Sequence, residues 1–284
     1  MRNALTFDVE EYFHAEAFAG LVRIEDWPRL ASRVAKSTRH LLDALDQQRT
    51  SATFFVLGWL AERDPALIRE IHARGHEIAC HSYGHRLIYR MDRPAFQADA
   101  RRAKRVIEDA IGAAVLGYRA PTFSVVRDTL WCLEVLAEEG FIYDSSIFPI
   151  HHDRYGISDA HRFPHRVTLP GGKHIAEFPI STVRVGGQHL PFSGGGYFRL
   201  APYRVVRRAL RHVNNRERMP AIVYLHPWEL DSEQPRLGLR GLSRLRHYVN
   251  LAHTARKLER LLADFKFAPV AHILGEHGLV ETVA

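Results

Sequence analysis

Short apolar segments alternate with amphipathic segments through the first half of the chain, and this order restricts the possible folds strongly. The predicted strands are residues 4–9, 52–57, 77–80, 115–118 and 141–144. The segment Ala52–Leu57 is almost wholly apolar, as expected for a strand buried on both faces. Strands that alternate with helices form parallel βαβ units, so we expect an α/β fold with a barrel or an open sheet.

Helical spacing and helix-ending residues define the segments between these strands. The predicted helices of the first half are residues 33–48, 59–74, 94–111 and 127–139. Gly75, Gly112 and Gly140 follow three of them directly, and glycine is the preferred residue just past a helix end. In the second half the sequence predicts a loop at 148–172, strands at 175–180, 221–225 and 269–274, and helices at 202–213 and 243–265.

Composition is typical of a globular protein with a basic surface. The 284 residues are 46% apolar and 25% charged, which allows one large core and argues against disorder. The formal net charge of +7 has two interpretations. The protein either has a merely basic surface, or is attracted to an anionic polymer or to the negative face of a membrane. The arginines are dispersed and no nucleic-acid-binding signature occurs, so we expect no nucleic acid partner.

The cysteines and the apolar segments bear on location. Cys80 and Cys132 form no CxxC pair and no disulfide framework, which favours a reducing compartment. The N-terminus shows no apolar signal-peptide core, and no apolar segment reaches the ~18 residues that span a bilayer. We therefore expect a cytoplasmic protein without a membrane span, for which peripheral membrane association is an option. The sequence predicts no oligomeric state.

Ionisable side chains follow five of the predicted strands. These residues are Asp8, Glu10, Glu11, His81, His85, Arg119, Asp144 and His226. In an α/β barrel the carboxyl ends of the strands meet at one rim, where reactive groups collect. The sequence therefore predicts a single site at this rim.

Two histidines four residues apart give the sharpest local signal. His81 and His85 can reach one ion from a helical turn or a tight loop, although they can also be two unrelated polar residues. A catalytic metal site needs a third ligand and an open position. Asp8 and Glu10 lie on one side of an extended strand, so one carboxylate can bind metal while the other takes a proton. The alternative is an acidic strand end that faces solvent.

Three further features allow a catalytic and a structural interpretation. Arg119 either orients a catalytic carboxylate or forms a structural salt bridge. Pro121 has no N–H, so the next backbone donor is Thr122, which can stabilise an oxyanion. His226 is either a general acid or a capped core histidine. The run Gly194–Gly196 matches no phosphate-binding loop and indicates a tight turn or a close backbone approach.

In this order, the segments resemble the NodB-homology polysaccharide deacetylases, carbohydrate esterase family 4. The resemblance is strongest to the branch linked to exosortase-associated exopolysaccharide systems, which carries a C-terminal domain of unknown function. The matching segments are Thr6–Asp8, His81–His85, Arg119–Pro121, Tyr143–Ser145 and Leu225–His226.

The resemblance implies a fold and a domain division. The fold would be a distorted (β/α) barrel with fewer than eight full units. Residues 1–230 would form the deacetylase domain, and residues 231–284 a C-terminal helical extension packed on the same barrel.

The resemblance also implies roles for the site residues. Asp8 would be the general base, Arg119 would position it, and His226 would be the general acid. His81 and His85 would bind the metal, usually zinc, with cobalt or nickel as substitutes.

Two departures from the family pattern affect the first and third motifs. Val9 stands where the family has a second aspartate, which makes Glu10 the natural replacement ligand, and Glu11 remains an alternative. Thr122 replaces the tyrosine of the third motif, so only its backbone N–H would serve as an oxyanion donor.

A third departure concerns the residue that tunes the general acid. No tryptophan closely follows Asp144, unlike the family's fourth motif. Asp144 or Asp153 would then tune His226.

The expected function is metal-dependent de-N-acetylation of an N-acetylated polysaccharide or oligosaccharide, in exopolysaccharide biosynthesis. One alternative keeps the site and hydrolyses a small-molecule C–N bond. Another is a non-catalytic relative that binds polysaccharide or protein, with the basic helix 243–265 as a docking face. The aromatic residues near the predicted rim either line a sugar groove or belong to the core; they are Tyr12, Phe13, His14, Trp59 and Trp228.

Overall fold

A largely parallel β-sheet forms the centre of the computed structural model, which describes residues 1–152 and 154–281. Its strand order is β10-β1-β2-β3-β4-β5-β7-β6, and β11 pairs with the beginning of β1. The strands are β1 (Arg2–Val9), β2 (Thr53–Val56), β3 (Glu77–Cys80), β4 (Gly117–Tyr118), β5 (Tyr143–Asp144), β6 (His165–Thr168), β7 (His174–Glu177), β10 (Ile222–Leu225) and β11 (Lys266–Ala268).

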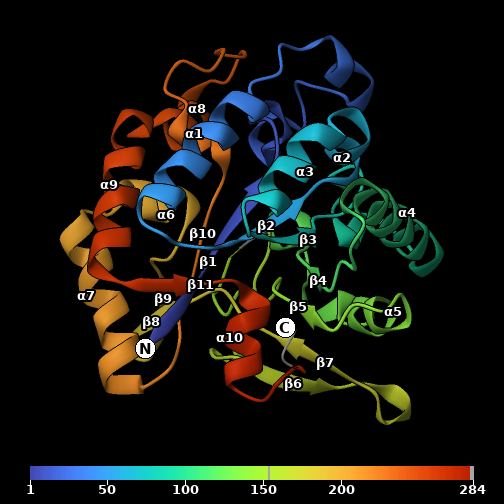
Figure 1. Ribbon diagram of the computed structural model, residues 1–284. Helices are drawn as coiled ribbons and strands as arrows, with labels where there is room; N and C mark the ends of the chain where they lie inside the picture. Colours follow the sequence, from blue (N-terminus) through green and yellow to red (C-terminus); the bar gives the residue numbers. More distant parts are fainter. Residues whose placement is uncertain (153, 282–284) are drawn as a thin grey trace.

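The sheet is a partial barrel. Among the described residues its hydrogen-bonded path begins at β10 and ends at β6, which runs antiparallel to β7 and does not pair with β10. Helices surround the sheet (Figure 1). This arrangement confirms the expected α/β fold, a distorted barrel with fewer than eight units and a helical C-terminal part.

Helices form in every segment that the apolar spacing predicts as helical, and α6 and α10 form in addition. They are α1 (Val34–Gln47), α2 (Gly58–Arg63), α3 (Pro65–Ala73), α4 (Arg93–Ile111), α5 (Cys132–Glu138), α6 (Gly195–Leu200), α7 (Tyr203–His212), α8 (Gly241–Tyr248), α9 (Leu251–Asp264) and α10 (Val270–Glu276). The carboxylate of Asp92 accepts a hydrogen bond from the Ala95 N–H and caps the start of α4. Gly112, with a φ of +69°, ends this helix in the left-handed conformation that glycine tolerates.

Two segments predicted as single helices are broken. The segment 59–74 divides at Asp64, because a residue that precedes proline avoids the helical conformation. Asp64 instead caps α3 by accepting from the Leu67 N–H. The segment 243–265 divides at Asn250, whose φ of +57° turns the chain between α8 and α9.

The sequence predicted the second half less accurately. The strand predicted at 269–274 is wrong, because Pro269 stands at the N-cap of α10 and the strand β11 precedes it. The predicted loop 148–172 contains β6, and β7 ends at Glu177 rather than at residue 180. A hairpin of β8 (Thr182–Val185) and β9 (Gln188–Pro191) was not predicted.

β1 joins the two halves of the chain. Ala4–Phe7 pair with Ile222–Leu225 on one side, and Thr6–Val9 pair with Thr53–Val56 on the other. β11, which follows residue 230, also pairs with β1. One sheet therefore contains both parts of the proposed division, and the boundary at residue 230 stays a prediction.

Among residues 1–152 and 154–281, no helix is both long enough and apolar enough to span a bilayer.

Gly194 makes the close backbone approach that the glycine run indicated. It bridges Tyr224 of β10, and a Cβ atom on Gly194 would lie 2.2 Å from the Tyr224 carbonyl oxygen. A Cβ on Gly196 would meet no atom closer than 4.0 Å. We expect Gly194→Ala to lower the free energy of unfolding by about 2 kcal/mol or more, as overpacking does.

Urea unfolding of purified protein measures this difference. Gly196→Ala is the matched control and should change the free energy of unfolding by less than about 1 kcal/mol. Equal effects of the two substitutions would contradict the assigned contact between Gly194 and Tyr224.

Candidate active site

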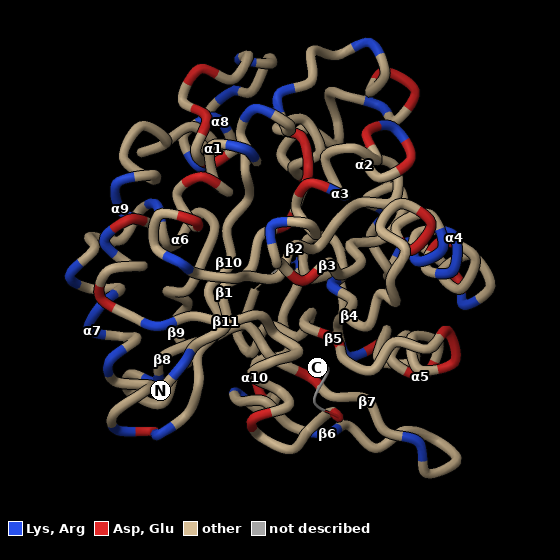
Figure 2. The backbone as a smooth tube through the Cα atoms, in the orientation of Figure 1, with Lys and Arg blue, Asp and Glu red and all other residues tan. Residues whose placement is uncertain are grey.

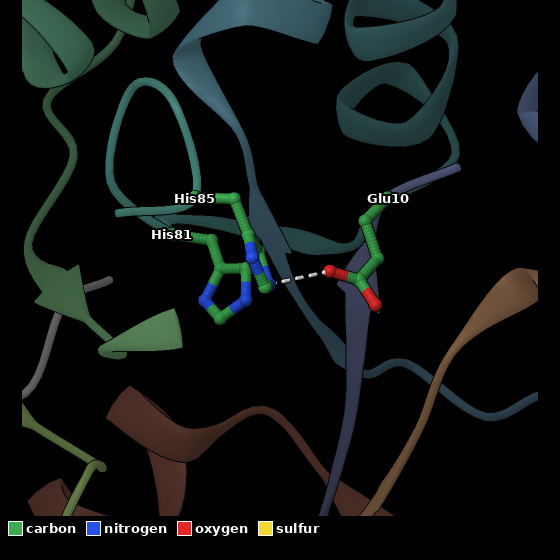
Figure 3. A group of neighbouring side chains, drawn as sticks. All are labelled: Glu10, His81 and His85. Atoms are coloured by element: carbon green, nitrogen blue, oxygen red, sulfur yellow. Dashed lines mark ion pairs between the residues drawn. The ribbon is translucent and has the colours of Figure 1, made fainter. Parts of the chain in front are cut away.

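Three side chains from two strand ends face one point. Glu10 follows β1, while His81 and His85 lie in the loop after β3. One ligand atom from each of the three lies within 4.8 Å of the others. Figure 3 shows both imidazole rings and the carboxylate directed toward the same region. One carboxylate oxygen and two imidazole nitrogens form a donor set that suits zinc and related divalent metals.

The hydrogen bonds of this group leave lone pairs available for a metal. The His81 Nδ1–H donates to the Arg119 carbonyl oxygen at 2.8 Å, because a carbonyl can only accept. The Nε2 atom of His81 therefore carries a lone pair. Glu10 Oε2 lies 2.8 Å from His85 Nε2, yet it has no partner in hydrogen-bond geometry among the described residues. A buried oxygen without a hydrogen bond, next to an imidazole nitrogen, fits a metal ligand.

The choice between Glu10 and Glu11 follows from the direction of the strand end. Glu11 accepts hydrogen bonds from the Arg33 N–H at 2.9 Å, the Val34 N–H at 3.2 Å and the Ser32 hydroxyl. Its carboxylate thus satisfies the free N–H groups at the start of α1. Glu10 is the ligand candidate, and Glu11 is a helix cap.

Burial and neighbouring charges shift the pKa values of these groups in directions that suit metal binding. Burial lowers the pKa of His81 to about 4, so its ring is neutral near pH 7, as ligation requires. Burial alone would raise the pKa of Glu10, but the imidazoles of His85 and His226 hold it below its usual range. Glu10 is therefore ionised.

Asp8 is held beside this group by a buried arginine. Arg119 donates through Nη1 to Asp8 Oδ1 at 2.8 Å and to the Thr6 hydroxyl at 2.8 Å. Its Nε and Nη2 donate to the carbonyl and hydroxyl oxygens of Ser145. The guanidinium also lies over the Phe55 ring at 4.0 Å. These contacts fix Asp8 Oδ1 and leave Oδ2 directed into the site.

Thr122 has a strained backbone. Its φ of +53° is a rare conformation for a β-branched side chain. The residue borders the cavity that Glu10, His81 and Asp8 line. This position is compatible with the backbone oxyanion role expected for Thr122.

His226 lies across the site from the two histidines. Its Nε2 atom is 3.5 Å from Glu10 Oε1 and 3.9 Å from Asp8 Oδ2. Its side chain is 17% exposed, more than those of Glu10 and Asp8. Burial alone would lower the pKa of His226, but the carboxylates of Glu10, Glu229 and Asp8 raise it to about 9. The ring therefore carries a proton near pH 7.

The sequence did not predict which carboxylate contacts the His226 ring. His226 Nδ1 lies 2.7 Å from Glu229 Oε1, and Glu229 is fully buried. The segment Pro227–Leu230 is a 3₁₀ turn, in which residues three apart lie on one face. The His-Pro-Trp-Glu spacing was the signal that could have identified Glu229.

Asp144 does not take the tuning role expected from the sequence. It accepts hydrogen bonds from the Ser146 hydroxyl at 2.6 Å and the Ser146 N–H at 3.2 Å. Ser146 also accepts from the Ala120 N–H, so Asp144 supports the chain beside Arg119. Glu229 replaces Asp144 as the carboxylate on His226. The alternative residue, Asp153, lies outside the described residues.

Arg199 connects Glu229 to the C-terminal helices. Its Nε atom lies 3.4 Å from Glu229 Oε2, and both side chains are buried. Its Nη1 donates to the carbonyls of His247, in the last turn of α8, and Val249, between α8 and α9. The C-terminal helices therefore hold the arginine that neutralises Glu229.

The aromatic residues near the rim are core residues for the most part. Tyr12, Phe13 and His14 are buried, and the first two pack with Trp27 and Trp228, which corrects the interpretation as a sugar groove. Trp59 packs on this cluster while partly exposed. Trp228 borders the cavity, where its indole N–H donates to Glu10 Oε1 at 3.1 Å.

A cavity of about 190 Å³ connects these groups. Its walls include the base, ligand and acid candidates, the Gly195–Gly196 turn and the aromatic rings of Phe123, Tyr155 and Tyr224. This volume lies below the ~300–1,000 Å³ of pockets that enclose a drug-sized ligand. The site is thus suited to one small group of a substrate.

Two family models match the chain. A polysaccharide deacetylase model matches residues 4–140, which contain all three ligand candidates, Asp8 and Arg119. A domain of unknown function (DUF3473) matches residues 145–275, which contain His226, Glu229 and Arg199.

Curated relatives are similar over part of their length. A chitooligosaccharide deacetylase from Bradyrhizobium sp. is 33% identical over 100 residues, 35% of this chain and 43% of the relative. A peptidoglycan-N-acetylglucosamine deacetylase from Bacillus cereus is 28% identical over 134 residues, 44% of this chain and 46% of the relative. The chain thus spans less than half the length of these two relatives.

Solved structures share the fold over almost the whole chain. A "putative polysaccharide deacetylase" from Mycobacterium smegmatis has a TM-score of 0.64 at 23% identity, covering 99% of this chain and 92% of that one. Puue allantoinase has a TM-score of 0.60 at 17% identity, covering 99% and 91%. At these identities the likeness shows the fold alone.

Removing both imidazoles should remove the metal. We expect His81→Ala with His85→Ala to lower bound divalent metal from about one equivalent to background, because Glu10 alone offers one ligand. Elemental analysis after dialysis measures the content.

The control replaces two exposed histidines, His40→Ala with His253→Ala, and should keep its metal. Full metal retention in the His81 and His85 variant would exclude the assigned site.

Proposed function

Residues 4–140 match the polysaccharide deacetylase family, and from this premise we propose that the chain removes N-acetyl groups from an N-acetylated polysaccharide or oligosaccharide. One observation carries the proposal. The ligand candidates Glu10, His81 and His85 face a single point between Asp8, held by Arg119, and His226. A base and an acid on either side of a metal site are the groups that amide hydrolysis requires.

Glu10, His81 and His85 would hold one divalent metal, for which zinc is favoured and cobalt or nickel are substitutes. When bound, such a metal polarises the acetyl carbonyl and lowers the pKa of water. The hydrogen bond that the Trp228 indole N–H donates to Glu10 orients one ligand candidate. The hydrogen bond that His81 donates to the Arg119 carbonyl orients a second one.

Asp8 acts as the general base. Arg119 occupies Oδ1, so Oδ2 takes the proton of the attacking water. Because the guanidinium pairs with Oδ1 and fixes the orientation of the carboxylate, Asp8 stays in place between turnovers.

The carbonyl oxygen becomes negatively charged when water adds. The backbone N–H of Thr122, a residue that borders the cavity, stabilises this oxyanion. No side chain is needed for this role, which explains how threonine can replace tyrosine.

His226 acts as the general acid. Its Nε2–H gives the proton to the leaving amine nitrogen, without which the C–N bond does not break. Glu229 holds Nδ1 and so keeps Nε2 directed at the site. The products are acetate and a free amino sugar.

The cavity favours a substrate that is held mostly outside it. About 190 Å³ accepts an acetamido group, while the rest of a sugar chain lies on the surface. The names of the curated relatives, chitooligosaccharide and peptidoglycan deacetylases, point to glucosamine-containing chains. A role in exopolysaccharide biosynthesis is the further part of this proposal.

A small cyclic amide is the competing substrate class, since the fold is shared with an allantoinase. An acetate-release assay on N-acetylated chitooligosaccharides and peptidoglycan fragments, with and without chelator, decides between them. Acetate release that stops with chelator supports deacetylation. Turnover of allantoin without acetate release, or no turnover of either, contradicts it.

Asp8→Asn should keep the metal and lose turnover. The amide can still accept from Arg119 but cannot take a proton, so we expect acetate release to fall about 10²–10⁴-fold. Metal content and circular dichroism serve as checks on folding. The exposed Asp128→Asn should retain full activity, and unchanged turnover of the Asp8 variant would remove Asp8 from the role of base.

Glu229→Gln tests the support of His226. The neutral amide keeps the size of the side chain but not its charge, so we expect kcat to fall about tenfold or more with little change in KM. Glu233→Gln, an exposed carboxylate nearby, is the control. A variant with normal kcat, or one that loses its metal, would contradict a role through His226.

A further inference from the structure

The surface of α8 and the loop before it combines exposed leucines with arginines. We define the α8 surface as Arg236, Arg240, Leu242, Arg244, Leu245 and Arg246. Leu242 and Leu245 are 69% and 59% exposed. They are three residues apart on a helix and lie on one face. Soluble proteins seldom expose neighbouring leucines without a partner for them.

The charge of this region has one sign. Residues 234–258 contain no Asp or Glu, and they include all four arginines of the α8 surface. Within residues 1–152 and 154–281, no carboxylate forms an ion pair with these four arginines. The buried Arg199 is paired with a carboxylate, whereas the four arginines of the α8 surface are exposed. The region is therefore complementary to an anionic partner.

A second segment extends the apolar part toward the site. Leu21 and Ile24 are 56% and 42% exposed. Leu21 Cδ1 lies near Gly238, and Ile24 Cδ1 lies near Gly84, the residue before the ligand candidate His85. Figure 1 shows α8 and this N-terminal segment at the same upper edge of the molecule. Exposed apolar side chains thus reach from α8 to the rim of the site.

We propose that the α8 surface docks on an anionic lipid bilayer. Leucines enter the boundary between headgroups and acyl chains, while arginines pair with lipid phosphates. A soluble anionic polysaccharide would pair with the arginines but offers no apolar phase for Leu242 and Leu245. The bilayer is the partner that satisfies both parts of the surface, and docking would hold the rim of the site close to the membrane.

α7 provides a matched comparison within the chain. It carries the exposed apolar residue Val205 and exposed arginines at 204 and 208, and the exposed Leu200 at the end of α6 lies just before it. Figure 2 shows α7 and α8 at opposite ends of the same side of the molecule. Since the two helices have similar composition, substitutions in α7 separate a specific surface from the general effect of a basic protein.

Vesicle sedimentation of the full chain tests the proposal. The vesicles contain phosphatidylcholine alone or phosphatidylcholine with phosphatidylglycerol. We expect binding to the anionic vesicles that weakens with salt. Leu242→Ser with Leu245→Ser should weaken it about tenfold. Arg240→Gln with Arg244→Gln should weaken it about 20- to 30-fold.

The α7 pairs, Leu200→Ser with Val205→Ser and Arg204→Gln with Arg208→Gln, should change binding less than about twofold. Equal losses from the α7 and α8 pairs would overturn the proposal, as would binding that ignores lipid charge. Retention by a soluble anionic polysaccharide that is insensitive to the two leucine substitutions would assign the surface to a polymer instead.

The test is independent of the proposed catalysis. Acetate release from a soluble oligosaccharide should be unchanged in the α8 variants, since none of these residues lines the cavity. A wild-type chain that binds vesicles but releases no acetate would remove the proposed function and leave the docking surface. The reverse result would remove the docking surface alone.

Discussion

The buried guanidinium of Arg119 determines how the site is assembled. Its side chain donates to Thr6 and Asp8 on β1 and to Ser145 after β5, and its carbonyl accepts from His81 after β3. A buried charge is costly unless it is paired and hydrogen-bonded, and Asp8 with these oxygens supplies both. One residue thus connects the base candidate, a metal-ligand candidate and three strands. Any displacement of these strands would leave a charge unsatisfied in the core.

The second half of the chain completes the site from the other side. β10 pairs with β1 and delivers His226 next to Glu10 and Asp8, while the turn after it delivers Trp228 and Glu229. Arg199 then ties Glu229 to the junction of α8 and α9. The helix that carries the α8 surface and the segment that carries His226 are therefore parts of one packed unit. A change in the position of α8 would act on Glu229 through Arg199.

Opposite environments separate the roles of similar groups. Glu10 and Glu11 are adjacent, but the strand directs one toward two imidazoles and the other toward the N-terminus of α1. His81 and His226 are both histidines, yet burial lowers the pKa of His81, while three carboxylates outweigh burial and raise that of His226. The first is suited to ligation and the second to carrying a proton.

Local signals in the sequence were sufficient for the α/β fold and for the site candidates Asp8, Glu10 or Glu11, His81, His85, Arg119 and His226, because buried parallel strands are apolar and their polar residues follow the strand end. Only the tertiary structure decided that Asp144 contacts Ser146 rather than His226, and that Tyr12, Phe13 and His14 are core residues. It also placed a helix at 270–276, where an apolar run fits a strand equally well. Such choices depend on which distant segments pack together, and spacing along the chain carries no information about that.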